Sequence, residues 1–127
     1  MTTDGKPAES KRVLVVEDEV MIRMLLEGML TELGHTVAGE AGGVDEALAL
    51  AKQGSFDIAI LDVNLNGKPI TPVVEVLIAR GVPFVFASGY GQEGVPQAYR
   101  GSRALQKPFQ AAALAQAIAE ASSKAAV

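Results

Sequence analysis

The sequence of 127 residues has no cysteine and only one histidine. Without cysteine, the chain can form no disulfide, thiolate metal site or thiol nucleophile, which is typical of a reducing compartment. Its apolar runs all fall short of the roughly 18 residues that cross a bilayer. The N-terminal segment "MTTDGKPAESKR" also lacks the apolar region of a secretory signal. We therefore expect a cytoplasmic location without membrane contact.

Charge and composition limit the class of protein further. The formal net charge is −4, so the chain lacks the basic excess that binds nucleic acid or anionic lipid. A hydrophobic content of 49% and a charged content of 20% fit a folded globular protein. A chain of this length can build one sizeable core. We expect a disordered tail over residues 1–10, one domain over 11–122 and a C-terminal tail over 123–127.

Apolar runs and helical periodicity alternate along the domain. Short runs rich in branched residues predict strands at residues 12–16, 36–40, 56–61, 83–87 and, with a weaker pattern, 103–106. Apolar residues spaced by three and four predict helices at residues 22–33, 44–53, 70–80 and 110–122. Alternation of this kind predicts an α/β fold, a doubly wound parallel sheet of five strands with helices on both faces.

Glycine and methionine refine this prediction. Gly34 and Gly81 stand just past two predicted helix ends, where a helix cap is expected. After Ser88, the glycine-rich segment "GYGQEGVPQAYRGS" predicts at most a short or mobile fourth helix of five. The methionines of the first helix, among them Met21 and Met24, are expected in or near the core.

Polar residues follow four of the predicted strands. In an open parallel sheet, ligands bind outside the carboxyl ends of the strands. The residues placed there are Glu17, Asp18 and Glu19 after the first strand, Asp62 and Asn64 after the third, Ser88 after the fourth and Lys107 after the fifth. Acids, a hydroxyl and an ammonium group are thus expected to converge on one edge of the sheet.

The excess of acid at this edge predicts a metal site. Carboxylates about 5 Å apart repel by roughly 3 kcal/mol per pair at an effective dielectric constant of about 20. One lysine does not offset three acids, and oxygen ligands suit Mg²⁺. A carboxylate beside Mg²⁺, a lysine and a hydroxyl is a site for phosphoryl transfer, in which the carboxylate attacks phosphorus and forms an acyl phosphate.

Each of these residues alone also has a structural explanation. The acids at 17–19 could favour a helix N-terminus, Asp62 and Ser88 could form turns, and Lys107 could be an exposed charge before a helix. Their joint position at successive strand ends favours a functional site. The single histidine, His35, has no partners for a zinc site or a catalytic pair, and is expected at the surface.

The segments "VLVVEDE", "DIAILDVNLNG", "FVFASGYG" and "LQKPF" resemble the receiver domains of two-component response regulators. The resemblance extends over residues 11–122, and "FASGYG" is similar to the F-A-T-G motif of a subgroup of stand-alone receivers. It implies a flavodoxin-like sheet with strand order 2-1-3-4-5. It also implies signal transduction by a phosphorylatable domain that passes the signal on by protein contact or onward phosphotransfer.

The resemblance also implies a role for each site residue. Asp62 would accept a phosphoryl group from a sensor histidine kinase or a phosphotransfer protein. Asp18 and Asp62 would bind Mg²⁺, with Glu17 acting through water and Asn64 through its backbone carbonyl. Ser88 and Lys107 would hold phosphoryl oxygens, and the peptide bond between Lys107 and Pro108 would be cis.

One position departs from the family, and two other functions compete with the receiver interpretation. Ala104 stands where family members commonly carry an aromatic residue, which leaves the phosphotransfer residues intact but changes the output mechanism. A phosphorylation-independent interaction module would not need the complete set of site residues. A phosphatase usually needs a second aspartate where the chain has Asn64. We therefore expect no enzyme activity beyond the chain's own phosphorylation and dephosphorylation.

Overall fold

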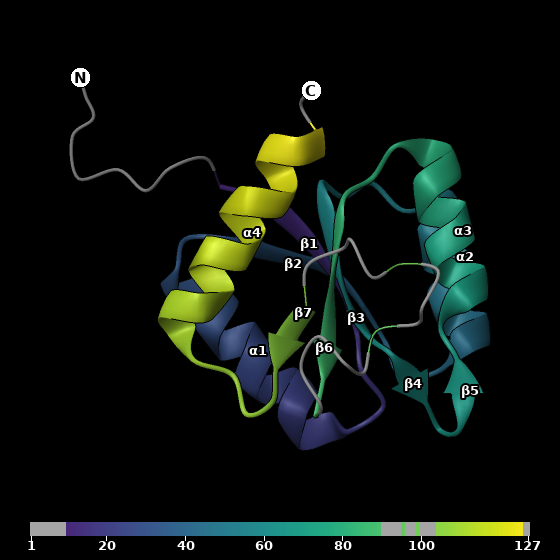
Figure 1. The fold of residues 1–127 in the computed structure, drawn as a ribbon, viewed down its shortest axis with the longest axis horizontal. Helices are drawn as coiled ribbons and strands as arrows, with labels where there is room; N and C mark the ends of the chain where they lie inside the picture. Colours follow the sequence, from purple (N-terminus) through teal and green to yellow (C-terminus); the bar gives the residue numbers. More distant parts are fainter. Residues whose placement is uncertain (1–9, 90–94, 96–98, 100–103, 126–127) are drawn as a thin grey trace.

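The computed structural model describes residues 10–89, 95, 99 and 104–125. Their central feature is a parallel sheet of five strands in the order β2-β1-β3-β6-β7 (Figure 1). The strands are β1 (Arg12–Val16), β2 (Thr36–Ala41), β3 (Ile58–Asp62), β6 (Phe84–Ser88) and β7 (Ala104–Gln106). Because β4 and β5 lie outside this sheet, its order in the chain is 2-1-3-4-5, and the predicted flavodoxin-like topology is confirmed.

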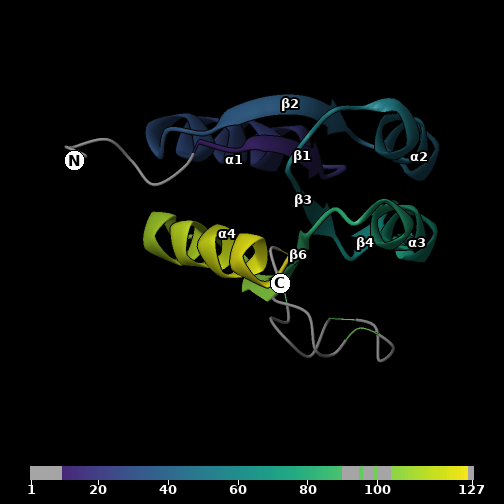
Figure 2. The same ribbon diagram turned by 90° about the horizontal axis from the view of Figure 1, so that it is seen from above.

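Four helices among the described residues cover the two faces of the sheet. They are α1 (Val20–Glu32), α2 (Val44–Gln53), α3 (Thr71–Arg80) and α4 (Ala111–Ala125). Figure 2 shows α1 and α4 on one face and α2 and α3 on the other. The predicted short fourth helix of five falls mostly on residues 90–94, 96–98 and 100–103, which lie outside the described residues.

The strands are apolar on both faces because both faces are covered. In β1, Val13 and Val15 pack into the cluster beneath α1 and α4, whereas Leu14 and Val16 pack into the cluster beneath α2 and α3. All four side chains are buried. This explains why β1 reads as a continuous apolar run instead of an alternating one.

Helix α1 corrects one prediction from the sequence. Met21 and Met24 are 82% and 63% exposed, so the expectation that they lie in or near the core is wrong. Only Leu26 and Leu30 are fully buried on this helix. A helix that covers one face of a sheet buries a single stripe of side chains, and the methionines at positions 21 and 24 lie outside that stripe.

The helix ends agree with the glycine positions. Gly34 and Gly81 both have positive φ, 91° and 73°, just past the ends of α1 and α3. Such left-handed positions favour glycine because it has no side chain to clash. Helix α4 continues to Ala125, three residues beyond the predicted end at 122. No helix in the described part of the chain is long and apolar enough to cross a membrane.

A small hairpin between β3 and α3 was not predicted. Its strands β4 (Asn64–Leu65) and β5 (Lys68–Pro69) pair in antiparallel fashion. The two residues between them, Asn66 and Gly67, have φ values of 51° and 81°. Positive φ at both positions is the requirement of a type I′ turn, for which Asn-Gly is a preferred pair. The sequence "LNGK" therefore carried the signal, although the strands are too short to show periodicity.

Candidate functional site

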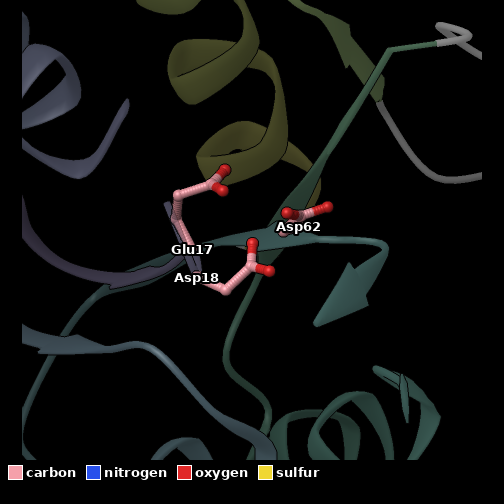
Figure 3. Close-up of side chains that lie close together, drawn as sticks. All are labelled: Glu17, Asp18 and Asp62. Atoms are coloured by element: carbon pink, nitrogen blue, oxygen red, sulfur yellow. The ribbon is translucent and has the colours of Figure 1, made fainter. Parts of the chain in front are cut away.

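Three acids gather at the carboxyl ends of β1 and β3. Glu17 and Asp18 follow β1 directly, and Asp62 is the last residue of β3, the strand that pairs with β1. Each of the three offers a carboxylate oxygen within 4.8 Å of the others (Figure 3). We call these residues the acidic cluster. The adjacent ends of two parallel strands bring them together, as expected from their positions in the sequence.

Lys107 reaches the acidic cluster from the segment after β7. Its Nζ lies 2.9 Å from Glu17 Oε1 and 3.2 Å from Asp62 Oδ2. Its backbone N–H donates a hydrogen bond to the carbonyl oxygen of Ser88 at 3.0 Å, which ties the segment to the end of β6. The peptide bond between Lys107 and Pro108 is cis, as the resemblance implied.

Glu17 is the most deeply buried acid of the cluster. Its side chain is only 1% exposed, and this burial raises its pKa to about 7. The contact with Lys107 and the hydrogen bond that Glu19 N–H donates to Glu17 Oε2 at 3.1 Å act in the opposite direction. Among the described residues no aligned hydrogen-bond donor reaches Glu17 Oε1, so its contact with Lys107 is an ion pair.

Lys107 and Asp18 favour their charged forms. Burial disfavours the ammonium of Lys107, but its contacts with Glu17 and Asp62 outweigh burial and raise the lysine pKa. Burial also disfavours the Asp18 carboxylate, but hydrogen bonds, first among them the one from the Asn66 backbone N–H, lower its pKa. That N–H donates to Asp18 Oδ2 at 3.2 Å.

Arg23 of α1 supports the backbone beneath the cluster, a role that the sequence did not reveal. Its Nη1 donates to the backbone oxygen of Glu17 at 3.2 Å, and its Nε lies 3.7 Å from Glu40 Oε1. A Cβ atom at Gly42 would come within 2.6 Å of Arg23 Nη1. Glycine at position 42 therefore leaves the space that the guanidinium occupies. No spacing rule links residues 17, 23 and 42, so this contact had no signal in the sequence.

Ser88 and Asn64 take the positions expected at the sheet edge. Ser88 is the buried last residue of β6 and follows Ala87, the residue paired with Asp62. Asn64 begins β4, two residues after Asp62, and only its backbone is described. The structure thus brings Glu17, Asp18, Asp62 and Lys107 into contact range, with Ser88 and Asn64 adjoining in the chain or in the sheet.

His35 lies apart from this site. It precedes β2, at the amino ends of the strands, whereas the acidic cluster is at their carboxyl ends. The ring is half-buried and not simply at the surface, and its Nδ1 accepts a hydrogen bond from Lys11 N–H at 3.0 Å. Burial and then the charge of Lys11 lower the His35 pKa. The neutral ring therefore accepts a backbone hydrogen bond and has no part in the acidic cluster.

The donor set fits a divalent cation. Three carboxylates face one ammonium group, and the buried Glu17 Oε1 lacks an aligned donor from the described residues. Mg²⁺ prefers oxygen ligands and is usually held by one or two carboxylates while it keeps several waters. The arrangement can therefore hold a cation next to the Asp62 carboxylate.

Comparison with known proteins matches residues 13–119 to the response regulator receiver domain. The transcriptional regulatory protein PdtaR of Mycobacterium tuberculosis is 37% identical over 121 residues, which are 92% of this chain and 59% of PdtaR. The chain thus spans only 59% of the length of that relative. The chemotaxis protein CheY of Thermotoga maritima is 32% identical over 115 residues, 85% of this chain and 94% of CheY.

A solved structure agrees with the sequence relatives. The solution structure of SdrG from Sphingomonas melonis Fr1 has a TM-score of 0.76 and 42% identity, covering 93% of this chain and 98% of SdrG. The family match, the sheet order and the SdrG likeness extend over nearly the whole described fold. The chain belongs to the response regulator receiver domain family of two-component signalling.

Proposed function

We propose that the chain is a phosphorylatable receiver in which Asp62 accepts a phosphoryl group in a Mg²⁺-dependent reaction. One observation carries the proposal: the Asp62 carboxylate lies between two further acids and an ammonium group 3.2 Å away. An exposed surface acid needs no such surroundings. A carboxylate that receives a phosphoryl group does need charged neighbours. Two anions repel each other, so nearby positive charge must neutralise the phosphoryl oxygens for the carboxylate to approach.

The chemistry follows from the groups at the sheet edge. An Asp62 oxygen attacks phosphorus, the new P–O bond forms as the P–N bond of a phosphohistidine donor breaks, and the released imidazole takes a proton. Lys107 can exchange its ion pair with Asp62 for one with a phosphoryl oxygen at little cost in free energy, because both interactions are charge-assisted hydrogen bonds. Ser88, the last residue of the adjacent strand, would donate its hydroxyl to a second phosphoryl oxygen.

Asp18 and Asp62 would hold Mg²⁺ directly, with Glu17 acting through water and Asn64 through its backbone carbonyl. The cation would neutralise charge on the phosphoryl oxygens during transfer. We expect no turnover of other substrates, because Asn64 stands where a phosphatase needs an acid that protonates the leaving group.

The partner of this reaction would be a histidine kinase or a phosphotransfer protein. Four exposed apolar residues lie in the first two turns of α1, just after Glu17 and Asp18 of the acidic cluster, and we call them the α1 patch: Val20, Met21, Met24 and Leu25. An exposed apolar patch marks a protein interaction surface more often than chance, and this one starts two residues after Asp18. It would dock the phosphodonor protein beside Asp62.

The decisive experiment is incubation with acetyl phosphate and MgCl₂ followed by intact-mass analysis. We expect one phosphoryl group on the wild type and none on Asp62→Asn. Asp45→Asn is the matched control, because Asp45 is an exposed acid at the start of α2 and is not one of the three acids of the cluster. Equal labelling of wild type and Asp62→Asn would remove Asp62 from its role. Absence of labelling in a folded wild type would favour the phosphorylation-independent interaction module.

A further inference from the structure

The tip of the β4–β5 hairpin touches the loops that follow β1 and β2. Asn66 uses two donors for this: its backbone N–H donates to Asp18 Oδ2 at 3.2 Å, and its side-chain Nδ2 donates to the carbonyl oxygen of Gly42 at 3.4 Å. These two acceptors are 48 and 24 residues away in the sequence. One residue of a two-residue turn thus connects three loops at the edge of the sheet.

The direction of the Asn66 N–H depends on its backbone. With φ at 51°, Asn66 is the only residue other than glycine with a positive φ in the described part of the chain. Asparagine tolerates this conformation better than most residues with a side chain. The hairpin is held in place beside it, since Leu65 is 1% exposed and belongs to the core cluster beneath α2 and α3. The left-handed turn therefore aims a fixed N–H at a carboxylate.

We infer that Asn66 is a positioning residue for Asp18, acting through its backbone N–H. The inference deepens the proposed function and rests on it, because it assigns a determinant of cation binding to the hairpin. Asp18 is half-buried on a loop, so its side chain would otherwise sample several rotamers. A hydrogen bond to Oδ2 selects one of them and leaves the carboxylate pre-oriented toward Glu17 and Asp62. Groups that orient metal ligands in this way contribute to affinity without touching the metal.

Two substitutions separate the backbone role from other effects. Asn66→Ala keeps the N–H but disfavours the left-handed conformation, so the N–H should turn away from Asp18. Asn66→Gly keeps both the N–H and the conformation and loses only the bond to Gly42. Gly81→Ala is the matched control for strain, because Gly81 also has a positive φ of 73°, has space for a Cβ and lies past α3, away from the acidic cluster.

The experiment measures the dissociation constant of Mg²⁺ by calorimetry with MgCl₂ alone, and the stability of each variant by urea unfolding in EDTA. We expect Asn66→Ala to weaken Mg²⁺ binding about tenfold, the lower end of the roughly 10- to 100-fold range for lost ligand orientation. Asn66→Gly and Gly81→Ala should stay within about twofold of the wild type, although Gly81→Ala loses stability as Asn66→Ala does. Weaker Mg²⁺ binding in Asn66→Ala, but not in the similarly destabilised Gly81→Ala, is the result that a merely structural role would not produce.

A second readout needs no metal. In the metal-free protein, the Asn66 amide signal in a ¹H–¹⁵N NMR spectrum should shift when Asp18 is changed to asparagine, because its hydrogen-bond acceptor loses its charge. Equal Mg²⁺ affinity of wild type and Asn66→Ala would overturn the inference alone, as would an equal loss in Asn66→Gly or an unmoved amide signal. Failure of the wild type to bind Mg²⁺ would overturn the proposed function together with it.

Discussion

Glu17→Gln should make the metal-free protein more stable than the wild type at pH 8, with only a small part of that difference remaining at pH 5. The wild-type Glu17 has its pKa raised from 4.5 to about 7, with burial as the main cause. The folded state therefore binds the Glu17 proton more tightly than the unfolded state. Stability is highest below the unfolded value, falls as pH rises from 4.5 to about 7, and is constant above that range.

The size of the effect follows from the same difference. A rise in pKa from 4.5 to about 7 corresponds to about 3 kcal/mol of unfolding free energy lost by pH 8. Because Lys107 remains 2.9 Å from Glu17 and can adjust to it, we expect a smaller loss of about 2 kcal/mol. Glutamine has the shape of the protonated acid but does not ionise, so this part of the pH dependence should vanish in Glu17→Gln.

The assay is urea unfolding of wild type and Glu17→Gln in EDTA at pH 5, 6.5 and 8. The difference between the two proteins cancels the contribution of His35, whose lowered pKa works in the opposite direction and reduces stability as pH falls below 6.5. Glu75→Gln is the control, because Glu75 is exposed on α3. Parallel pH profiles of wild type and Glu17→Gln would refute the reasoning, since the pKa of Glu17 would then be the same in the folded and unfolded states.

Two further predictions concern phosphorylation. Lys107→Ala should slow labelling by acetyl phosphate on the order of 10²-fold, because the main protein cation near the phosphoryl oxygens is lost; a wild-type rate in a mass-spectrometric time course would contradict the role of Lys107. Met21→Ser combined with Met24→Ser should slow phosphotransfer from a histidine kinase but leave acetyl phosphate labelling unchanged, since the side chains are exposed and their loss changes stability by less than about 0.5 kcal/mol. Equal slowing with both donors would remove the α1 patch from docking.

The sheet could be predicted because its strands are buried on both faces. Strand β1 was predicted at residues 12–16 and observed at Arg12–Val16, and helix α2 was predicted at 44–53 and observed at Val44–Gln53. Both segments have strong local patterns between clear breaks. The hairpin was missed because two-residue strands have no periodicity, so only the Asn66–Gly67 pair could have revealed it.

The site could be predicted as far as strand ends determine it. Asp18, Asp62 and Lys107 were predicted to lie together because parallel strands bring their carboxyl ends to one edge, a rule that needs only the order of elements. The contacts of Arg23 and Asn66 depend instead on loop geometry and on the space left at a glycine. Hydropathy likewise finds the apolar residues of a helix but not which of them face the sheet.

The charge balance of the acidic cluster argues that function, and not stability, maintains it. With all three acids ionised, three carboxylates face the single ammonium of Lys107, an excess of two negative charges. Buried ion pairs contribute little net stability even when balanced, so an unbalanced set destabilises the metal-free fold. Burial is the main cause of the raised pKa of Glu17, and the negative charge of Asp62 raises it further. A divalent cation would neutralise this excess of two charges, and under the proposed function it would allow a phosphoryl group to be held beside Asp62.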